Sequence, residues 1–444
     1  MSRPVARPLA AILGLLAGLL GVLGTPAPAA ADNVVTPGNF TGYGFDQCLA
    51  PTQKAMNAWL KHSPFLSVGI YISGDSRACR SQPNLTPAWI STQLRKDWRL
   101  LPITLGPQAS CSTRFPRYGD DETIRPKPGT AGKYRPARRQ GRAEAVSAVA
   151  AATKLGIVPG STLWYDLEGF DHTNKHCRES ALSFLSAWTT KLHELDYVSG
   201  VYSSVGSGIK ALDDARVERP KAYVMPDAIW LARWDGVANT SSSYIREDGW
   251  RPGGRVKQYL GGHDETWGGV RINIDSNYLD LGKGSWAAPE THCDGVPVDL
   301  TNYKPVRPAT TATDRVRALQ CLLTEKGVYA GKLSGSYSPK TIEAVHAWQK
   351  QRGLPTSDAF TRTAWMTLVA SGPSKVVKFG SAGPEVRRVQ RALNAASKNA
   401  QLEVTGVFTG PTDKALRAYQ ARVGIKASGV AAPATWTALR TGTR

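Results

Sequence analysis

The chain has 444 residues and a formal net charge of +20, from 55 Lys and Arg against 35 Asp and Glu. This length exceeds that of one ordinary domain, so we expect two or three domains. The positive charge is concentrated toward the C-terminus, because residues 301–444 hold 22 Lys and Arg against 7 Asp and Glu. A chain this basic is expected to bind an anionic partner, mainly through its C-terminal part.

The first 31 residues have the pattern of a secretory signal peptide. Arg3 and Arg7 precede an apolar run at 9–23, and three alanines at 29–31 form an A-x-A cleavage site. A lone membrane anchor is the alternative, but the run is short for a span and small residues follow it. We therefore expect a protein that is secreted, extracellular or associated with the cell wall, without stable membrane insertion after cleavage. Its anionic partner is then a cell-wall polymer and not a nucleic acid.

Between residues 33 and 284, short apolar runs alternate with helix-like stretches. The runs predict eight strands, at residues 43–46, 68–73, 101–105, 163–168, 200–203, 228–234, 256–259 and 272–275. Helices are predicted between the earlier strands, at residues 51–61, 87–98, 138–155 and 178–195. Eight strands with intervening helices in roughly 250 residues are what a (β/α)8 TIM-like barrel requires, and such barrels do their chemistry at the carboxyl ends of the strands.

The fourth predicted strand carries two acids in an otherwise apolar run. Asp166 and Glu168 are two residues apart, so a strand places both on one face, with Cα atoms about 6.6 Å apart. Neighbouring carboxyls raise the proton affinity of one of them, which supplies the acid and the anion that glycoside cleavage needs. The alternative is an ordinary strand end whose acids pair with Lys or Arg. It is disfavoured because Asp46, Trp234 and Asp275 also fall at predicted strand ends.

Six cysteines follow the predicted cleavage site, and an even number in an exported chain favours disulfides. The first four each follow one of the first four strands, so they should lie at the same end of the barrel as the acids. Sequence does not separate their three possible connectivities. Because their loops are adjacent, Cys48 is expected to pair with Cys79 and Cys111 with Cys177. The simplest remaining pair joins Cys293 in the linker to Cys321 in the first repeat. No metal site is expected, because there is no C-x-x-C motif and His172 and His176 lie in a polar loop.

The C-terminal part contains a duplicated unit. Equivalent positions are Leu319-Gln320 and Val389-Gln390, Gly335 and Gly406, Tyr337 and Phe408, Thr341 and Thr412, Trp348-Gln349 and Tyr419-Gln420, Trp365 and Trp436, and Leu368 and Leu439. Apolar residues recur at helical spacing, so each copy should be a bundle of about three helices. The pattern resembles the peptidoglycan-binding type 1 domain. This resemblance implies two small all-α peptidoglycan-binding domains, at 313–371 and 375–442, after a Gly-, Pro- and Thr-rich linker at 285–312.

The strand motifs of the predicted barrel, residues 33–284, also resemble a known family. They are Gly-Phe-Asp46, Trp-Tyr-Asp166-Leu-Glu168, Gly-Val-Tyr202-Ser203, Trp230-Leu-Ala-Arg-Trp234, Lys-Gln258-Tyr259 and Ile-Asp275-Ser-Asn277-Tyr. These look like the motifs of family-25 glycoside hydrolases, the barrel muramidases. They resemble still more closely an exported actinobacterial glycoside-hydrolase-like family known as domain of unknown function 1906.

The muramidase resemblance implies roles for the acids. Glu168 would be the proton donor, and Asp166 the partner that positions or stabilises the substrate. Asp46 and Asp275 would be supporting acids on the first and last strands. An ionised Asp166 would keep Glu168 protonated near neutral pH. The same motifs suggest these substrate-binding residues: Tyr202, Trp234, Gln258, Tyr259 and Asn277.

The sequence therefore predicts a secreted, muramidase-like glycoside hydrolase that cleaves peptidoglycan glycan. We expect it to act as a monomer without a cofactor, held on the wall by its two C-terminal domains. One alternative is a non-catalytic wall-binding or scaffold protein that keeps the barrel as a carbohydrate receptor. Another is an enzyme for a different cell-wall polysaccharide. The basic segment 114–139 is interpreted either as a substrate lip or as a disordered surface loop.

Overall fold

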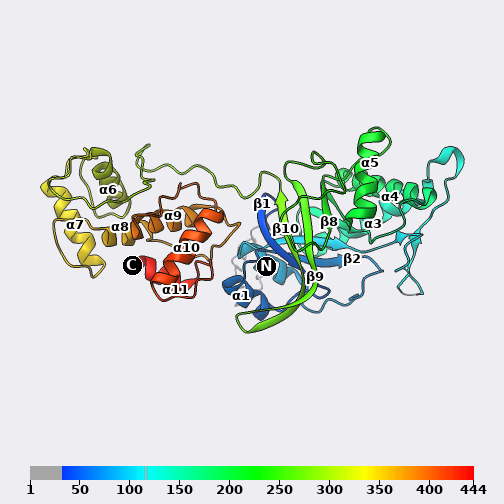
Figure 1. The fold of residues 1–444 in the computed structure, drawn as a ribbon, viewed down its shortest axis with the longest axis horizontal. Coiled ribbons are helices and arrows are strands. Elements are labelled where there is room, and N and C mark those ends of the chain that lie inside the picture. Colours follow the sequence, from blue (N-terminus) through cyan, green and yellow to red (C-terminus); the bar gives the residue numbers. More distant parts are fainter. Residues whose placement is uncertain (1–32, 115, 118) are drawn as a thin grey trace, which may run out of the picture. The chain divides into compact units, whose positions relative to one another are not determined.

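The computed structural model describes residues 33–114, 116–117 and 119–444. The predicted signal peptide lies outside the described residues. Within them, eight strands close into a barrel in the order β1-β10-β9-β8-β7-β6-β3-β2 (Figure 1). The strands are β1 Phe40–Asp46, β2 Ser67–Ser73, β3 Arg99–Thr104, β6 Thr162–Asp166, β7 Val198–Ser204, β8 Ala228–Ala232, β9 Gly254–Trp267 and β10 Val270–Leu281. This closed barrel with accompanying helices confirms the predicted fold class.

Helices connect the strands as far as β8. They are α1 Gln53–His62, α2 Pro87–Arg95, α3 Arg135–Lys154, α4 Lys175–Glu194 and α5 Lys210–Glu218. The side chains of Thr52, Thr86 and Asn174 cap α1, α2 and α4 by accepting a hydrogen bond from a first-turn N–H. The sequence does not predict α5, which is short and buries few apolar side chains. No helix in the described part of the chain is long and apolar enough to span a membrane.

The last strand, β10, differs from the parallel arrangement that a (β/α)8 barrel implies. It runs antiparallel to both of its neighbours, β1 and β9. The β9–β10 hairpin turns at Gly268 and Gly269, whose φ angles of 59° and 76° suit glycine. The expectation that Asp275 ends a parallel strand is therefore wrong. Asp275 lies within β10 and reaches the end of the barrel that carries Asp46 because the antiparallel register pairs these two residues.

Large aromatic side chains fill the barrel interior beneath the acids. Trp164 on β6 and Trp230 on β8 are almost completely buried, and their rings meet edge to face with centroids 5.6 Å apart. Gly200 on β7 leaves the space for this packing, because a Cβ there would collide with the Trp164 ring. The barrel is thus a packed core that supports a site at one end, not an open channel.

The C-terminal repeats each contain three helices within residues 313–441. The first has α6 Thr313–Glu325, α7 Pro339–Gln351 and α8 Arg362–Val369, and the second has α9 Pro384–Ala396, α10 Gly410–Arg422 and α11 Pro433–Thr441. The glutamine, glycine and threonine that recur in both repeats are joined by hydrogen bonds. Gln390 accepts a hydrogen bond from the Gly406 N–H at 3.0 Å and donates to Thr412 Oγ1 at 3.1 Å. Gln320 makes the same two bonds in the first repeat, so this glutamine fixes the turn before the second helix.

Residues 298–306, within the predicted linker, pack against the repeats. Val298, Tyr303 and Val306 are buried in the same core as the repeat helices. A second set of contacts joins the other side of the repeats to the barrel. Lys378, just before α9, is 1% exposed and donates to the carbonyl oxygens of Ser63 and Phe65 at 2.8 and 2.9 Å. These carbonyls lie between the end of α1 and the start of β2.

Candidate active site

The four acids predicted from the strand motifs gather at one end of the barrel. Asp46 ends β1, Asp166 ends β6, and Asp275 pairs with Asp46 across β10. Glu168 follows β6, and its backbone N–H donates to Gln108 Oε1 at 2.8 Å. Asp46, Glu168 and Asp275 line one pocket of about 200 Å³. The fold therefore brings together carboxyl groups that are far apart in the sequence.

Asp166 and Glu168 have different surroundings. Asp166 is 2% exposed; its Oδ2 accepts from the Tyr71 hydroxyl at 3.2 Å, and its Oδ1 has no hydrogen-bond partner within the described residues. Burial, and then the negative charge of Glu168, raise the pKa of Asp166 well above its usual range. The Glu168 side chain is 22% exposed and lies 3.6 Å from the Arg114 guanidinium. Burial therefore favours the protonated form of Asp166, whereas the D-x-E motif predicted an ionised Asp166.

Asp46 and Asp275 form a second acidic pair. Asp46 Oδ2 accepts from the side-chain amides of Asn277 at 2.7 Å and Gln258 at 3.2 Å. Burial, followed by the charge of Asp275, raises the pKa of Asp46 to about 7, and burial also raises the pKa of Asp275. Near neutral pH this pair therefore shares a proton and keeps negative charge beside the first pocket.

Gln258 connects this second pair to an exposed aromatic ring. Its Oε1 accepts from the Tyr202 hydroxyl at 3.0 Å and from Trp234 Nε1 at 2.9 Å, while its Nε2 donates to Asp46. Trp234 is 63% exposed, and its ring lies against Gly261, where a Cβ would collide with it. A fixed and exposed indole of this kind offers an apolar face to a sugar ring.

Glu168 lies between two pockets. On one side is the pocket that it shares with Asp46 and Asp275. On the other side is a pocket of about 310 Å³ that Glu168 shares with Tyr202 and Trp234. A chain of sugars that occupied both pockets would place a linkage next to the Glu168 carboxyl group.

Arginines surround the acids. Arg77 and Arg117 line the first pocket and Arg114 lines the second. The Arg77 guanidinium is held by the Gly74 carbonyl at 2.6 Å, and Arg117 donates to the Ser76 carbonyl at 3.3 Å. The mouth of the site therefore combines negative charge at its floor with positive charge at its walls, an arrangement that suits a sugar with an anionic substituent.

The cysteines all lie in the described part of the chain, and they pair as predicted. The bonds are Cys48–Cys79, Cys111–Cys177 and Cys293–Cys321. The first bond lines the pocket of the acids, and the second fastens the loop before Arg114 to α4. Both bonds therefore restrain loops at the mouth of the site.

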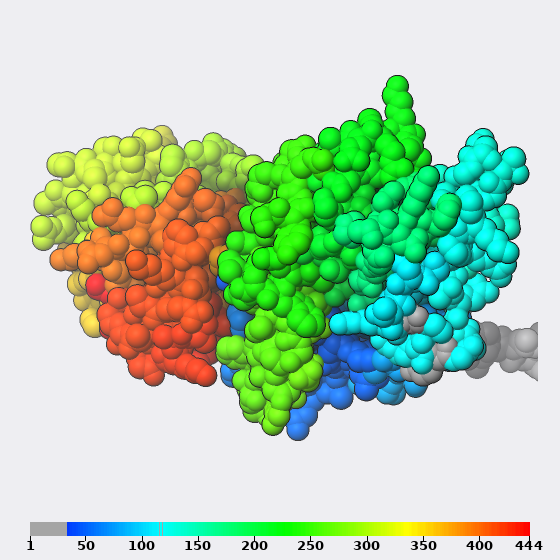
Figure 2. Space-filling model, turned by 45° about the vertical axis from the view of Figure 1, so that its right-hand side comes forward, coloured from blue at the N-terminus to red at the C-terminus, as the bar shows by residue number. Residues whose placement is uncertain are grey.

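The inserted segment 114–139 stands out on the surface in cyan (Figure 2). Its short strand β5 Thr123–Ile124 pairs with β4 Gln108–Ala109, which follows β3. Arg114 and Arg117 from this segment line the two pockets, so the segment forms part of the wall of the site.

Three of the predicted substrate-binding residues, Gln258, Tyr259 and Asn277, do not line either pocket. Tyr259 follows Gln258 at a register shift between β9 and β10, and its side chain meets Ser276 instead of the acids. Asn277 is completely buried; it donates to Asp46 and accepts from Trp230 Nε1 at 2.9 Å. Asn277 is thus placed to position Asp46, not to contact a substrate.

Sequence reasoning missed three residues of the site. Tyr71 on β2 bonds Asp166, and Arg77 follows the same strand. Gln108 donates to the Asp166 carbonyl and accepts from the Glu168 N–H, both at 2.8 Å, and so fixes the end of β6. Tyr71 occupies a predicted strand and could have been found from its position there. Arg77 and Gln108 lie beyond strand ends, where no periodic pattern marks them.

The closed barrel with a cluster of acids at one end defines a glycoside hydrolase-like protein. The chain belongs to the Rv2525c-like, glycoside hydrolase-like domain family, whose model matches residues 57–279. Residues 312–358 and 382–439 match a second family, described as a peptidoglycan binding domain. Among curated proteins, no sequence matches this chain. The two family matches relate the protein to cell-wall glycan.

Solved structures with a similar fold include three from bacteria. An uncharacterized Bacillus stearothermophilus protein is 18% identical, with 54% of this chain and 95% of that protein covered and a TM-score of 0.34. The modular autolysin LytC from Streptococcus pneumoniae is 13% identical, with 54% and 46% covered and a TM-score of 0.33. The Tat-secreted Rv2525c of Mycobacterium tuberculosis, in complex with L-tartrate, is 13% identical, with 55% and 98% covered and a TM-score of 0.33.

Proposed function

We propose that the protein is a secreted cell-wall glycosidase of muramidase type, which cleaves the glycan of peptidoglycan and is held on the wall by its C-terminal repeats. The observation that carries this proposal is the place of Glu168 between two pockets, beside a buried acid that holds a proton. An acid in this position can reach the oxygen of a linkage between sugars in the two pockets.

In this proposal Glu168 is the proton donor. Sugar binding excludes water from Glu168 and draws Arg114 toward the substrate. Both changes raise the proton affinity of Glu168, so that it can take up the proton of the pair. Asp46 and Asp275 supply negative charge beneath the sugar whose bond breaks, where an oxocarbenium-like state develops. An N-acetyl group of the substrate can serve as the nucleophile, so a further protein nucleophile is not required.

The arginines support a muramoyl glycan over a neutral one. A muramoyl sugar from which the peptide has been removed carries a free lactyl carboxylate, which a guanidinium binds well. Arg77 and Arg117 stand beside the acids in the first pocket, and Trp234 offers a ring face in the second. The pockets thus have the chemistry to hold a carboxylated sugar on one side of Glu168 and another sugar on the other side.

The alternative is a carbohydrate receptor that does not cleave its ligand. The ion pair of Arg114 with Glu168 favours it, because a nearby guanidinium stabilises the carboxylate over the acid. Incubation of the mature protein with purified peptidoglycan, followed by mass spectrometry of the released fragments, separates the two functions. We expect fragments with new reducing ends. Glycan binding without any such release would support the receptor and overturn the proposed hydrolase.

A further inference from the structure

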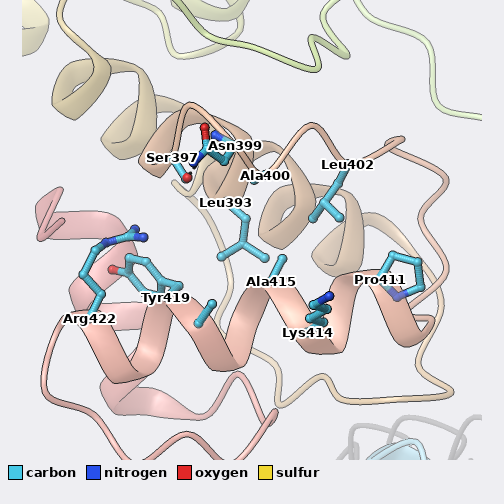
Figure 3. Close-up of a pocket in the computed structure, with 11 residues that line it drawn as sticks. Leu393, Ser397, Asn399, Ala400, Leu402, Pro411, Lys414, Ala415, Tyr419 and Arg422 are labelled. Carbon is cyan, nitrogen blue, oxygen red and sulfur yellow. Dashed lines mark hydrogen bonds between the residues drawn. The ribbon is translucent and has the colours of Figure 1, made fainter.

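The second repeat contains a pocket of about 370 Å³ that lies far from the acids in sequence. It opens between the end of α9, the loop that follows it and one face of α10 (Figure 3). Its floor is apolar, formed by Leu393, Leu402, Ala415 and Ala418. The alanines leave room on the helix surface, which a larger side chain would fill.

The wall of this pocket is firmly held. Asn394 on α9 is completely buried, and its side chain bonds the backbone of Leu402 in both directions, at 2.7 and 2.8 Å. Tyr419 on α10 is 1% exposed, and its hydroxyl donates to the Thr443 carbonyl at 2.9 Å. The loop and the helix that form the pocket are therefore fixed before any ligand arrives.

Two cations stand at opposite ends of the apolar floor (Figure 3). Lys414 and Arg422 are eight residues apart on α10, a spacing of about 12 Å along a helix. Within the described residues neither side chain has a carboxylate partner, although Arg422 lies over the Tyr419 ring at 5.5 Å. Other arginines of this repeat do have acidic partners; Arg417, on the same helix, pairs with Asp413 at 2.7 Å.

The first repeat keeps the alanines of this pocket but carries its charge at a different position, where Arg352 lies over the Trp348 ring at 4.3 Å. The register that pairs Trp348 with Tyr419 places Glu343 at the position of Lys414 and Gln351 at the position of Arg422. The alanines are unchanged, as Ala344 and Ala347. The loop after the first helix of each repeat also differs. The first repeat buries Tyr329 in this loop, at 5% exposure, near the position where the second repeat has Asn399 and Ala400. The two repeats therefore differ in the charges that they carry at these two positions of the second helix.

We propose that this pocket binds an anionic oligopeptide with small apolar side chains, the chemistry of the peptide stems of peptidoglycan. The alanine-lined floor accommodates methyl groups, and the two cations bind carboxylates spaced along the peptide. The two repeats then have different roles, and only the second recognises peptide. This inference rests on the wall-binding part of the proposed function and does not depend on cleavage by the barrel.

Titration calorimetry of the full-length mature protein tests the inference, with Glu168→Gln present to prevent any cleavage. The probes are the N-acetylglucosaminyl-N-acetylmuramoyl disaccharide with its peptide, the same disaccharide without peptide, and the free peptide. We expect the two peptide-bearing probes to bind and Lys414→Gln/Arg422→Gln to weaken their binding by about tenfold or more, because two charged contacts are lost. The matched control is Lys340→Gln/Lys350→Gln, which removes two exposed charges from the equivalent helix of the first repeat and should leave affinity unchanged.

Equal loss of affinity in the control variant would show that net charge alone holds the peptide and would overturn the inference. Unchanged affinity in Lys414→Gln/Arg422→Gln would also overturn it, as would failure of the peptide-bearing probes to bind. A disaccharide without peptide that competes equally would assign the pocket to glycan instead. Fragment release by the wild-type barrel is scored separately, so either proposal can fail while the other stands.

Discussion

Gln258 and Asp46 are 212 residues apart in the chain and are joined by a hydrogen bond of 3.2 Å in the buried floor of the site. The same glutamine holds the exposed Trp234 ring and the Tyr202 hydroxyl. One amide thus sets the position of an acid on β1 and of an aromatic ring after β8. The sugar-facing ring and the acidic floor are therefore expected to respond together to a change at this residue.

Gln258→Met should reduce both stability and glycan binding. Methionine has a similar length but cannot bond Asp46, Tyr202 or Trp234, so it leaves buried polar groups without partners, at a cost of about 1–3 kcal/mol each. Thermal unfolding and glycan titration measure the two effects. Tyr259→Phe is the matched control, because the side chain of this neighbour meets Ser276 instead of the acids. A Gln258→Met protein with wild-type glycan affinity would contradict the proposed role of the Trp234 platform.

Glu168→Gln should preserve folding and glycan binding and lower the rate of cleavage by at least about 100-fold, the scale of general acid catalysis. Asp166→Asn should also be impaired, because it removes the proton that the pair shares. Release of reducing ends from peptidoglycan measures both rates. Undiminished release by Glu168→Gln would remove this residue from the mechanism.

The stability of the protein should depend on Asp46 between about pH 4 and pH 7. The folded state raises the pKa of this carboxyl from 3.8 to about 7, so the folded protein binds the proton more tightly than the unfolded chain. Its contribution is therefore present below pH 4 and is lost as pH rises through 7. Asp46→Asn mimics the protonated acid and should flatten this part of the profile, by on the order of 4 kcal/mol. Denaturant unfolding of both proteins at pH 4 and pH 7 measures the difference, and parallel profiles would contradict the shift.

Arg77→Gln should weaken the use of muramoyl glycan and spare neutral glycan. On muramoyl glycan without peptide, loss of a charged hydrogen bond to the free lactyl carboxylate corresponds to a rise in KM of about tenfold or more, with a smaller effect on kcat. Chitooligosaccharide binding, which involves no carboxylate, should not change. Arg95→Gln, an exposed arginine on α2, is the control. Equal losses on the two glycans would indicate that Arg77 supports the loop and does not select the substrate.

Removal of the Cys48–Cys79 bond should affect the site, whereas removal of Cys293–Cys321 should not. Each bond is expected to contribute about 2–4 kcal/mol to stability, so both double Cys→Ser variants should unfold at lower temperature. Only the first bond lines the pocket of the acids, so only its loss should weaken glycan binding. Thiol titration of the denatured, unreduced protein should find no free thiol, and several free thiols would contradict the three bonds.

The barrel and the cluster of acids were predictable because both follow from local patterns. Alternation on a strand placed Asp166 and Glu168 on one face, and strand ends pointed to Asp46. The Gly268-Gly269 pair was the available signal for a hairpin and for the reversed direction of β10.

Other parts of the site depend on contacts that no local pattern records. Burial decides which acid of a pair holds the proton, and burial is set by the fold around Asp166, not by the D-x-E motif. Tyr71 and Gln108 bond Asp166 from separate segments of the chain. Their roles become visible only when β2, β3 and β6 lie side by side.

Lys378 has a consequence for the way in which the proposed hydrolase would search the wall. Its ammonium group is buried and surrounded by barrel carbonyls, and Phe379 packs on Tyr43 with ring centroids 5.3 Å apart. If a flexible linker joined the repeats to the barrel, the barrel could reach glycan in every direction around each attachment point. An anchor seated in this way has no such freedom. In the proposed function, each attachment would then present the barrel with bonds at one fixed distance, and the next cleavage would require the repeats to dissociate and bind again.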